Sequence, residues 1–247
     1  KNTVKRIIKE ETEYRRVALK WIPYNITKEQ KMHRVEKSKE MLQKIQARRR
    51  DKFKGIFTGD ETWIYYRNPA KQAWVKKGDE IPQRTRKCIG DPKVMITVFF
   101  SASEIRFIHA LDSGQNMNSE IFIKDILKPL ERNALNDIQF DEEDLLIHFD
   151  NASPHTSKKT KSFIKNSSFT KIPQPPYSPD LSLADFYLFG YLKGALKGRN
   201  FTTAEDALEA TTEVLNKIDS RTLLRVFNNW LIRLRYVIDS NGEYYND

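Results

Sequence analysis

The sequence predicts an α/β domain built on a mixed β-sheet, and three observations lead to that prediction. A length of 247 residues with 39% apolar content allows one substantial core without further division. β-Branched and aromatic residues concentrate between residues 56 and 111, which is typical of an antiparallel meander. A helical pattern at 118–135 then leads into an apolar run at 145–147, so at least one strand should run parallel to its neighbour.

Residues 1–55 form a basic segment, predicted to be a helical linker or dimer contact ahead of one main domain at 56–247. The segment holds 18 of the 43 Lys and Arg residues but only 7 of the 33 Asp and Glu residues. Thr27 can cap a helix with a sparse apolar stripe, and Pro23 interrupts the helical pattern before it. Such concentrated charge favours contacts with nucleic-acid phosphates, although a solvated, lysine-rich helix face is the alternative.

Cysteine usage and hydropathy exclude other classes of protein. The single cysteine, Cys88, cannot form an internal disulfide, and its spacing from the four histidines is not that of a zinc site. The longest apolar run, at 94–100, is far shorter than the roughly 20 residues that cross a bilayer, and no secretory leader opens the chain. We therefore expect a soluble protein of a reducing compartment, with no membrane contact.

The first half of the main domain should be mostly β. Strands are expected at 56–58, 63–66, 71–75, 94–101 and 104–111. A polar loop at 76–93 carries Arg84, Arg86 and Lys87 and is too long for a tight hairpin, and loops of this length are usually functional or disordered.

The second half should alternate helices and short strands. A helix at 118–135 precedes the strand at 145–147, a second helix begins at Ser153, and a short strand follows at 169–172. The proline-rich stretch at 173–179 leads to a helix that starts near Ser182, and helices complete the chain. Ligands of such sheets bind at the carboxyl ends of strands, and Asp150 falls at such an end.

Asp60, Asp150 and Asp185 are the main candidates for a functional site. Taken singly, each has a structural explanation: a turn after Gly59, an Asx-turn, and a capping box with Ser182. Taken together, they suit small divalent cations such as Mg²⁺, which prefer carboxylate oxygens. If the three carboxylates converge, two ions held there can promote in-line displacement at phosphorus.

Other acidic residues are weaker candidates. The run at 141–144 is expected to be a solvated turn, because consecutive acids point in several directions. Asp180 lies in a proline turn, where it should cap backbone donors, and Glu61 should face away from Asp60 by strand alternation. His155 is either an ordinary early-helix histidine or a residue that orients a carboxylate or a DNA phosphate.

Several local strings resemble, in order, blocks of the mariner branch of the Tc1/mariner DNA transposases. Asp150 and Asp185 are separated by 34 residues, and a third aspartate rather than a glutamate points to the mariner branch. One departure is Phe149, because the family often has histidine directly before the second aspartate. Here His148 stands one position earlier, on the opposite face of a strand. The strings lie at 21–24, 58–63, 150–156, 177–181 and 241–245.

The resemblance implies an RNase H-like fold, a central mixed sheet flanked by helices. It implies that Asp60, Asp150 and Asp185 hold Mg²⁺ or Mn²⁺, as two ions, for cleavage at terminal inverted repeats and insertion at TA target DNA. It also implies a nuclear homodimer, with Trp21 and Pro23 as dimer-linker residues and a DNA-binding helix-turn-helix region upstream. The predicted DNA contacts are Arg48, Arg49, Arg50, Lys52, Arg84, Arg86, Lys87 and His155.

Two other functions remain open from the sequence. One is a host-retained nuclear DNA-binding protein, derived from a transposase but without efficient cleavage. The other is a structural α/β adaptor in which the acids only cap helices and turns. Intact aspartates at all three positions argue against decay of the site.

Overall fold

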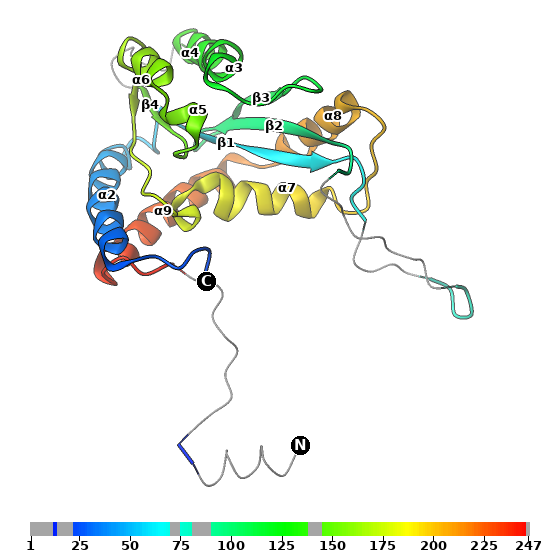
Figure 1. Ribbon diagram of the computed structural model, residues 1–247, viewed down its shortest axis with the longest axis horizontal. Coiled ribbons are helices and arrows are strands. Elements are labelled where there is room, and N and C mark those ends of the chain that lie inside the picture. Colours follow the sequence, from blue (N-terminus) through cyan, green and yellow to red (C-terminus); the bar gives the residue numbers. More distant parts are fainter. Residues whose placement is uncertain (1–11, 14–21, 70–74, 81–89, 138–144, 246–247) are drawn as a thin grey trace.

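The computed structural model describes residues 12–13, 22–69, 75–80, 90–137 and 145–245 (Figure 1). The helices and strands of this part are, in chain order, α2 (Lys28–Ala47), β1 (Ile56–Tyr65), β2 (Lys93–Phe100), β3 (Ile105–Ala110), α3 (Ser119–Ile121), η1 (Phe122–Leu127), α4 (Lys128–Leu135), β4 (Leu145–His148), α5 (Ser153–Thr156), α6 (Lys158–Lys165), β5 (Phe169–Lys171), η3 (Pro179–Leu181), η4 (Ala184–Leu188), α7 (Phe189–Ala195), α8 (Ala204–Leu215) and α9 (Ser220–Asp239).

The sheet has five strands in the order β3-β2-β1-β4-β5. β1 pairs antiparallel with β2, and β2 antiparallel with β3, whereas β1 with β4 and β4 with β5 are parallel pairs. The prediction of a mixed sheet is therefore confirmed. β1 is the central strand: residues 56–58 pair with β4, residues 58–65 pair with β2, and Thr58 is paired on both sides.

The strand predictions at the start of the domain need one correction. The two short strands expected at 56–58 and 63–66 are parts of the single strand β1. Gly59 lies between them, and a Cβ there would come within 2.5 Å of the Phe99 ring, so glycine permits the close pairing with β2. The strand expected at 71–75 falls mainly outside the described residues, and Val75 itself belongs to no strand.

Helices cover both faces of the sheet (Figure 1). One face packs on α7, α8 and α9, and its core contains Ile96, Val98 and Trp230. The other face packs on the helical segments between 119 and 135, and its core contains Phe57 and Phe99. Side chains alternate between the two cores along each strand, as the pleat of a sheet requires.

Helix α2 packs against α9 and is part of the larger core (Figure 1). Thr27 caps it as expected, in a capping box in which Thr27 and Gln30 each bond the other's backbone N–H. Met41 and Ile45 on its inner face are fully buried among residues of the sheet and α9. The described end of the basic segment therefore shares its core with the rest of the molecule.

Candidate active site

The register of the sheet brings Asp60 and Asp150 to the same level. Thr58 in β1 is paired with His148 in β4, and each aspartate lies two residues further along its own segment. The Thr58 hydroxyl oxygen lies 2.9 Å from Nδ1 of His148, so these two side chains point to the same face. Residues two apart along an extended chain share a face, and Asp60 and Asp150 therefore start from neighbouring positions on it.

Asp185 reaches this face from η4, a short π-helical segment that packs against β1. Isolated π-helical turns are often found at functional sites. The Asp185 N–H donates to the Ser182 hydroxyl at 3.4 Å, which is one of the two bonds of the capping box considered from the sequence. The prediction of a helix starting near Ser182 is thus correct to within two residues.

Two clefts meet at Asp185. One, of about 560 Å³, runs along β1 and α7 and is lined by residues that include Trp63, Lys193 and Lys197. The other, of about 410 Å³, contains Asp150 together with Tyr24 and Tyr177. Because Asp185 lines both, the acids lie where an elongated ligand can pass from one cleft to the other.

The carboxylates lie close enough to affect one another's protonation. Burial, followed by the charges of Glu61, Asp150 and Asp185, raises the pKa of Asp60 well above its usual range. Burial also raises the pKa of Asp185, and the charge of Asp150 adds to this effect while Ser182 and Lys193 oppose it. The folded protein therefore disfavours the ionised forms of Asp60 and Asp185, and a bound cation would favour them.

His155 connects Asp150 with Glu61. Its Nδ1 lies 2.6 Å from Oδ1 of Asp150, and its Nε2 lies 3.4 Å from Oε2 of Glu61. Burial lowers the pKa of His155, but the hydrogen bond with Asp150 and the nearby Glu61 carboxylate outweigh burial and raise the pKa to about 9. Burial acts to raise the pKa of Asp150, but the hydrogen bonds from His155 and from the backbone N–H of Ala152 outweigh burial, and the pKa of Asp150 is lowered overall.

The structure adds a role for Glu61 and decides between the two alternatives for His155. Glu61 starts from the face opposite Asp60, as expected from strand alternation, but α5 places His155 beside it, so Glu61 belongs to the electrostatics of the site. His155 is not an ordinary early-helix histidine, because it orients Asp150 and packs 4.1 Å from the ring of Phe122. Asp180 does accept the backbone N–H of Tyr245, but its main partner is Arg34.

The donor set of the site suits a hard divalent cation, since it consists of carboxylates that affect one another's pKa values, and two of them, Asp150 and Asp185, line open clefts. In the described part of the chain, however, no group of three or more His, Cys, Asp or Glu side chains is arranged as a ready-made metal site.

Comparisons with known proteins identify the family. The sequence model of the DDE superfamily endonucleases matches residues 56–208. The chain belongs to this family. The prediction of a mariner-type DDE domain is also confirmed, because Mariner Mos1 transposase of Drosophila mauritiana is 23% identical over 229 residues, covering 91% of this chain and 66% of the relative.

A second relative is named for a histone-lysine methyltransferase rather than for a transposase. Human histone-lysine N-methyltransferase SETMAR is 29% identical over 234 residues, which are 92% of this chain but 33% of that protein. The chain thus spans a third of SETMAR and just under two thirds of Mos1.

A solved structure confirms the fold. The Mos1 mariner paired-end complex with Mn has a TM-score of 0.84 at 23% identity, over 99% of this chain and 72% of that one. The expected RNase H-like sheet flanked by helices is therefore correct.

The predicted DNA and dimer contacts of this DDE domain remain predictions. Arg48 caps α2, Arg49 donates to Asn228 of α9 at 3.3 Å, and Arg50 and Lys52 are exposed. Pro23 is half-buried. Trp21, Arg84, Arg86, Lys87 and the acidic run at 141–144 lie outside the described residues. Within the described residues, no helix is long and apolar enough to cross a membrane.

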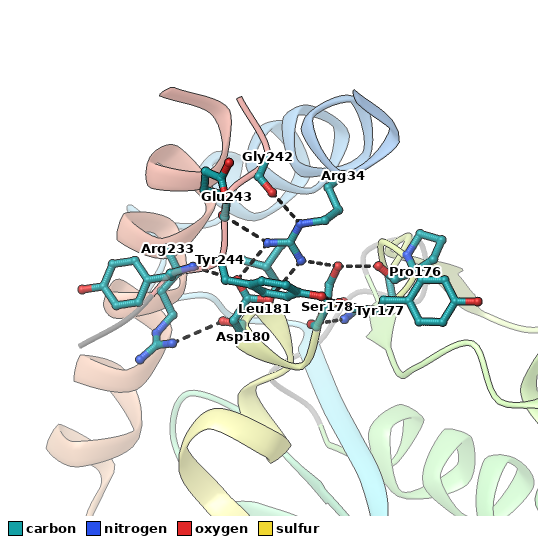
Figure 2. Close-up of polar contacts among 12 residues, drawn as sticks. Arg34, Pro176, Tyr177, Ser178, Asp180, Leu181, Arg233, Gly242, Glu243 and Tyr244 are labelled. Carbon is teal, nitrogen blue, oxygen red and sulfur yellow. Dashed lines mark hydrogen bonds and ion pairs between the residues drawn. The ribbon is translucent and has the colours of Figure 1, made fainter. Parts of the chain in front are cut away.

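Arg34 of α2 is a structural residue that the sequence did not single out (Figure 2). Its guanidinium donates to both carboxylate oxygens of Asp180, at 3.0 and 2.9 Å, and to the Ser178 hydroxyl at 2.5 Å. It also donates to the carbonyl oxygens of Gly242 and Glu243. Arg34 therefore joins three distant parts of the DDE domain, and a lone arginine on a helix gives no local signal of such a role.

Proposed function

We propose that this DDE domain is the catalytic part of a mariner-type DNA transposase that cuts DNA strands at transposon ends and joins them to TA target DNA. The observation that carries the proposal is the common face and mutual charge effects of Asp60, Asp150 and Asp185. The sequence likeness to a mariner transposase supports it.

Asp60, Asp150 and Asp185 are proposed to hold two Mg²⁺ or Mn²⁺ ions. Such ions lower the barrier by activating the attacking oxygen and stabilising the leaving oxygen of an in-line displacement. Asp60 and Asp185 supply carboxylates whose pKa values are raised first by burial and then by the charges of neighbouring acids, and a cation would favour their ionised forms. His155 holds Asp150 in its ionised form and in one orientation. The attacking oxygen is that of water for cleavage and that of a DNA 3′-hydroxyl for joining.

The two clefts are the proposed path of the DNA strand. Lys193 and Lys197 line the first cleft and can neutralise phosphates, and the exposed rings of Tyr24 and Tyr177 line the second. Arg48, Arg49, Arg50 and Lys52 are proposed to contact DNA outside the clefts, which accords with the overall charge of +10. We place this activity in the nucleus and in a homodimer, in line with the paired-end complex of the Mos1 relative.

A plasmid assay tests the assignment. The parent protein should nick supercoiled DNA in the presence of Mn²⁺, and Asp60→Ala, Asp150→Ala or Asp185→Ala should abolish nicking while the far-UV circular dichroism spectrum stays the same. Asp239→Ala is the matched control, because it removes an exposed aspartate at the end of α9. Undiminished nicking by any of the three site variants would contradict the assignment.

A second function is a host-retained DNA-binding protein without efficient cleavage. The observation in its favour is the likeness to SETMAR, a relative named for a methyltransferase rather than for transposition. It predicts that the parent protein shifts DNA in a gel but leaves supercoiled plasmid intact at millimolar Mn²⁺.

A further inference from the structure

A series of buried hydrogen bonds links β1, which carries Asp60, with β4, which precedes Asp150, and with the 173–179 loop, which precedes the segment of Asp185. The Thr58 hydroxyl lies 2.9 Å from Nδ1 of His148, and Nε2 of His148 lies 2.8 Å from Oε1 of Gln174. Nε2 of Gln174 donates to the carbonyl oxygen of Ser178 at 2.8 Å, and the Ser178 hydroxyl accepts from Arg34. These five residues are called the buried network below.

The bonding pattern assigns a direction to each bond. The amide nitrogen of Gln174 is committed to Ser178, so its Oε1 accepts the Nε2–H of His148. Nδ1 of His148 then carries no proton and accepts the hydroxyl of Thr58. The imidazole is therefore the neutral Nε2–H tautomer, held between β1 and the 173–179 loop.

Each end of the buried network lies next to an aspartate. Thr58 and His148 come two residues before Asp60 and Asp150 in their strands. At the far end, Arg34 binds Asp180, which lies five residues before Asp185 in the chain (Figure 2).

The side chains of the buried network are almost inaccessible to solvent, from 0% exposure for Arg34 to 7% for Gln174. The ring of Trp230 packs against His148 at 4.9 Å. Buried polar groups are costly unless every donor and acceptor is satisfied, and apolar residues of the same shape often give similar stability. Stability alone therefore does not explain why five polar residues are buried here. A requirement for a fixed geometry of the segments that they join does explain it.

We propose that Thr58, His148 and Gln174 are positioning residues that set the separation of the three acid-bearing segments, and thereby the affinity of the site for divalent cations. The inference rests on the proposed function, because it concerns the same site. His148 thus has a role on the face opposite the position where the mariner family often has histidine. Phe149, which takes that position, is buried in the smaller core instead.

The test compares two buried threonines. Thr58→Val keeps the shape of the side chain but removes the donor to His148. Thr211→Val is the matched control, because Thr211 is fully buried in α8 and donates at 2.7 Å to the Ala207 carbonyl, outside the buried network. Thr58→Ser, which keeps the hydroxyl, should behave like the parent. Titration calorimetry with Mn²⁺ alone should give about tenfold weaker binding for Thr58→Val and parental binding for the other two.

A second measurement does not depend on any variant folding. ¹⁵N-labelled histidine in the parent protein should show an Nε2–H tautomer for His148. An Nδ1–H tautomer, or equal Mn²⁺ affinities of Thr58→Val and Thr211→Val, would overturn the positioning role and leave the nuclease assignment intact. A parent protein that binds Mn²⁺ without nicking plasmid, with weaker binding by Thr58→Val, would instead overturn the proposed function and support the positioning role.

Discussion

Replacing Arg34 with methionine should destabilise the protein far more than any surface charge change on the same helix. Arg34 is fully buried, the Asp180 side chain is 5% exposed, and their bond is bidentate. Removing the arginine leaves the Asp180 carboxylate without its counter-charge inside the protein, which typically costs about 3–5 kcal/mol. Urea unfolding followed by circular dichroism should therefore show a lower midpoint with an unchanged slope.

The matched control is Lys31→Met. Lys31 lies three residues earlier on α2 and pairs with Glu243, in the same C-terminal segment that Arg34 binds, but this pair is solvent-exposed. Exposed pairs contribute about 0–1 kcal/mol. Equal losses for Arg34→Met and Lys31→Met would refute the reasoning. In a double-mutant cycle, Arg34→Met with Asp180→Leu should cost less than the sum of the single changes, because the second removes the orphaned charge.

Three further predictions concern charge. Asp60→Asn should leave the metal-free protein as stable or more stable, because burial and neighbouring acids already disfavour the ionised form, and it should abolish any rise in melting temperature with Mn²⁺. Burial lowers the pKa of His148 to about 4. In the unfolded protein, His148 takes up a proton near pH 6.5, so the free energy of unfolding should fall by on the order of 3 kcal/mol between about pH 6.5 and 4. The measurement is the difference in free energy of unfolding between the parent and His148→Phe, from urea titrations at each pH. Identical pH profiles of the two proteins would contradict this prediction. A triple alanine variant of Arg48, Arg49 and Arg50 should bind DNA with a weaker salt dependence. The slope of log binding constant against log salt concentration should flatten by up to about 0.9 for each phosphate that is no longer neutralised, and an unchanged slope would exclude these arginines from the interface.

Local sequence signals predicted the elements that depend on local physics. The cap at Thr27 was found because its partner stands three residues away, within reach of one helical turn. Strand β4 was found because its apolar run is buried on both faces. Asp60 and Asp150 were singled out because each stands in a distinctive local string, and Asp185 by its spacing of 34 residues from Asp150; the sheet register then brings Asp60 and Asp150 to neighbouring positions.

Local sequence signals failed where a residue's contacts in the fold are with residues far away in the sequence. The polar residues Asp60 and Glu61 after Gly59 are typical of a turn, yet the strand continues because β2 pairs with it from Thr58 to Tyr65. Strand alternation predicted that Glu61 faces away from Asp60, but it could not predict that α5 brings His155 to that opposite face. Arg34 was missed because its partners lie 144 to 209 residues away along the chain.

The Arg34 contacts also give a structural role to two of the family-like sequence strings, which contain no proposed metal ligand. The string at 177–181 supplies Ser178 and Asp180 to the guanidinium, and the string at 241–245 supplies two carbonyl oxygens and the ring of Tyr244, whose centroid lies 4.5 Å from it. Gly242 has a positive φ of 91°, and a Cβ there would come within 2.5 Å of the Lys31 carbonyl oxygen, so glycine is needed for this approach. Both strings thus hold α2 against the segment that leads to Asp185, and their chemistry is that of positioning rather than catalysis.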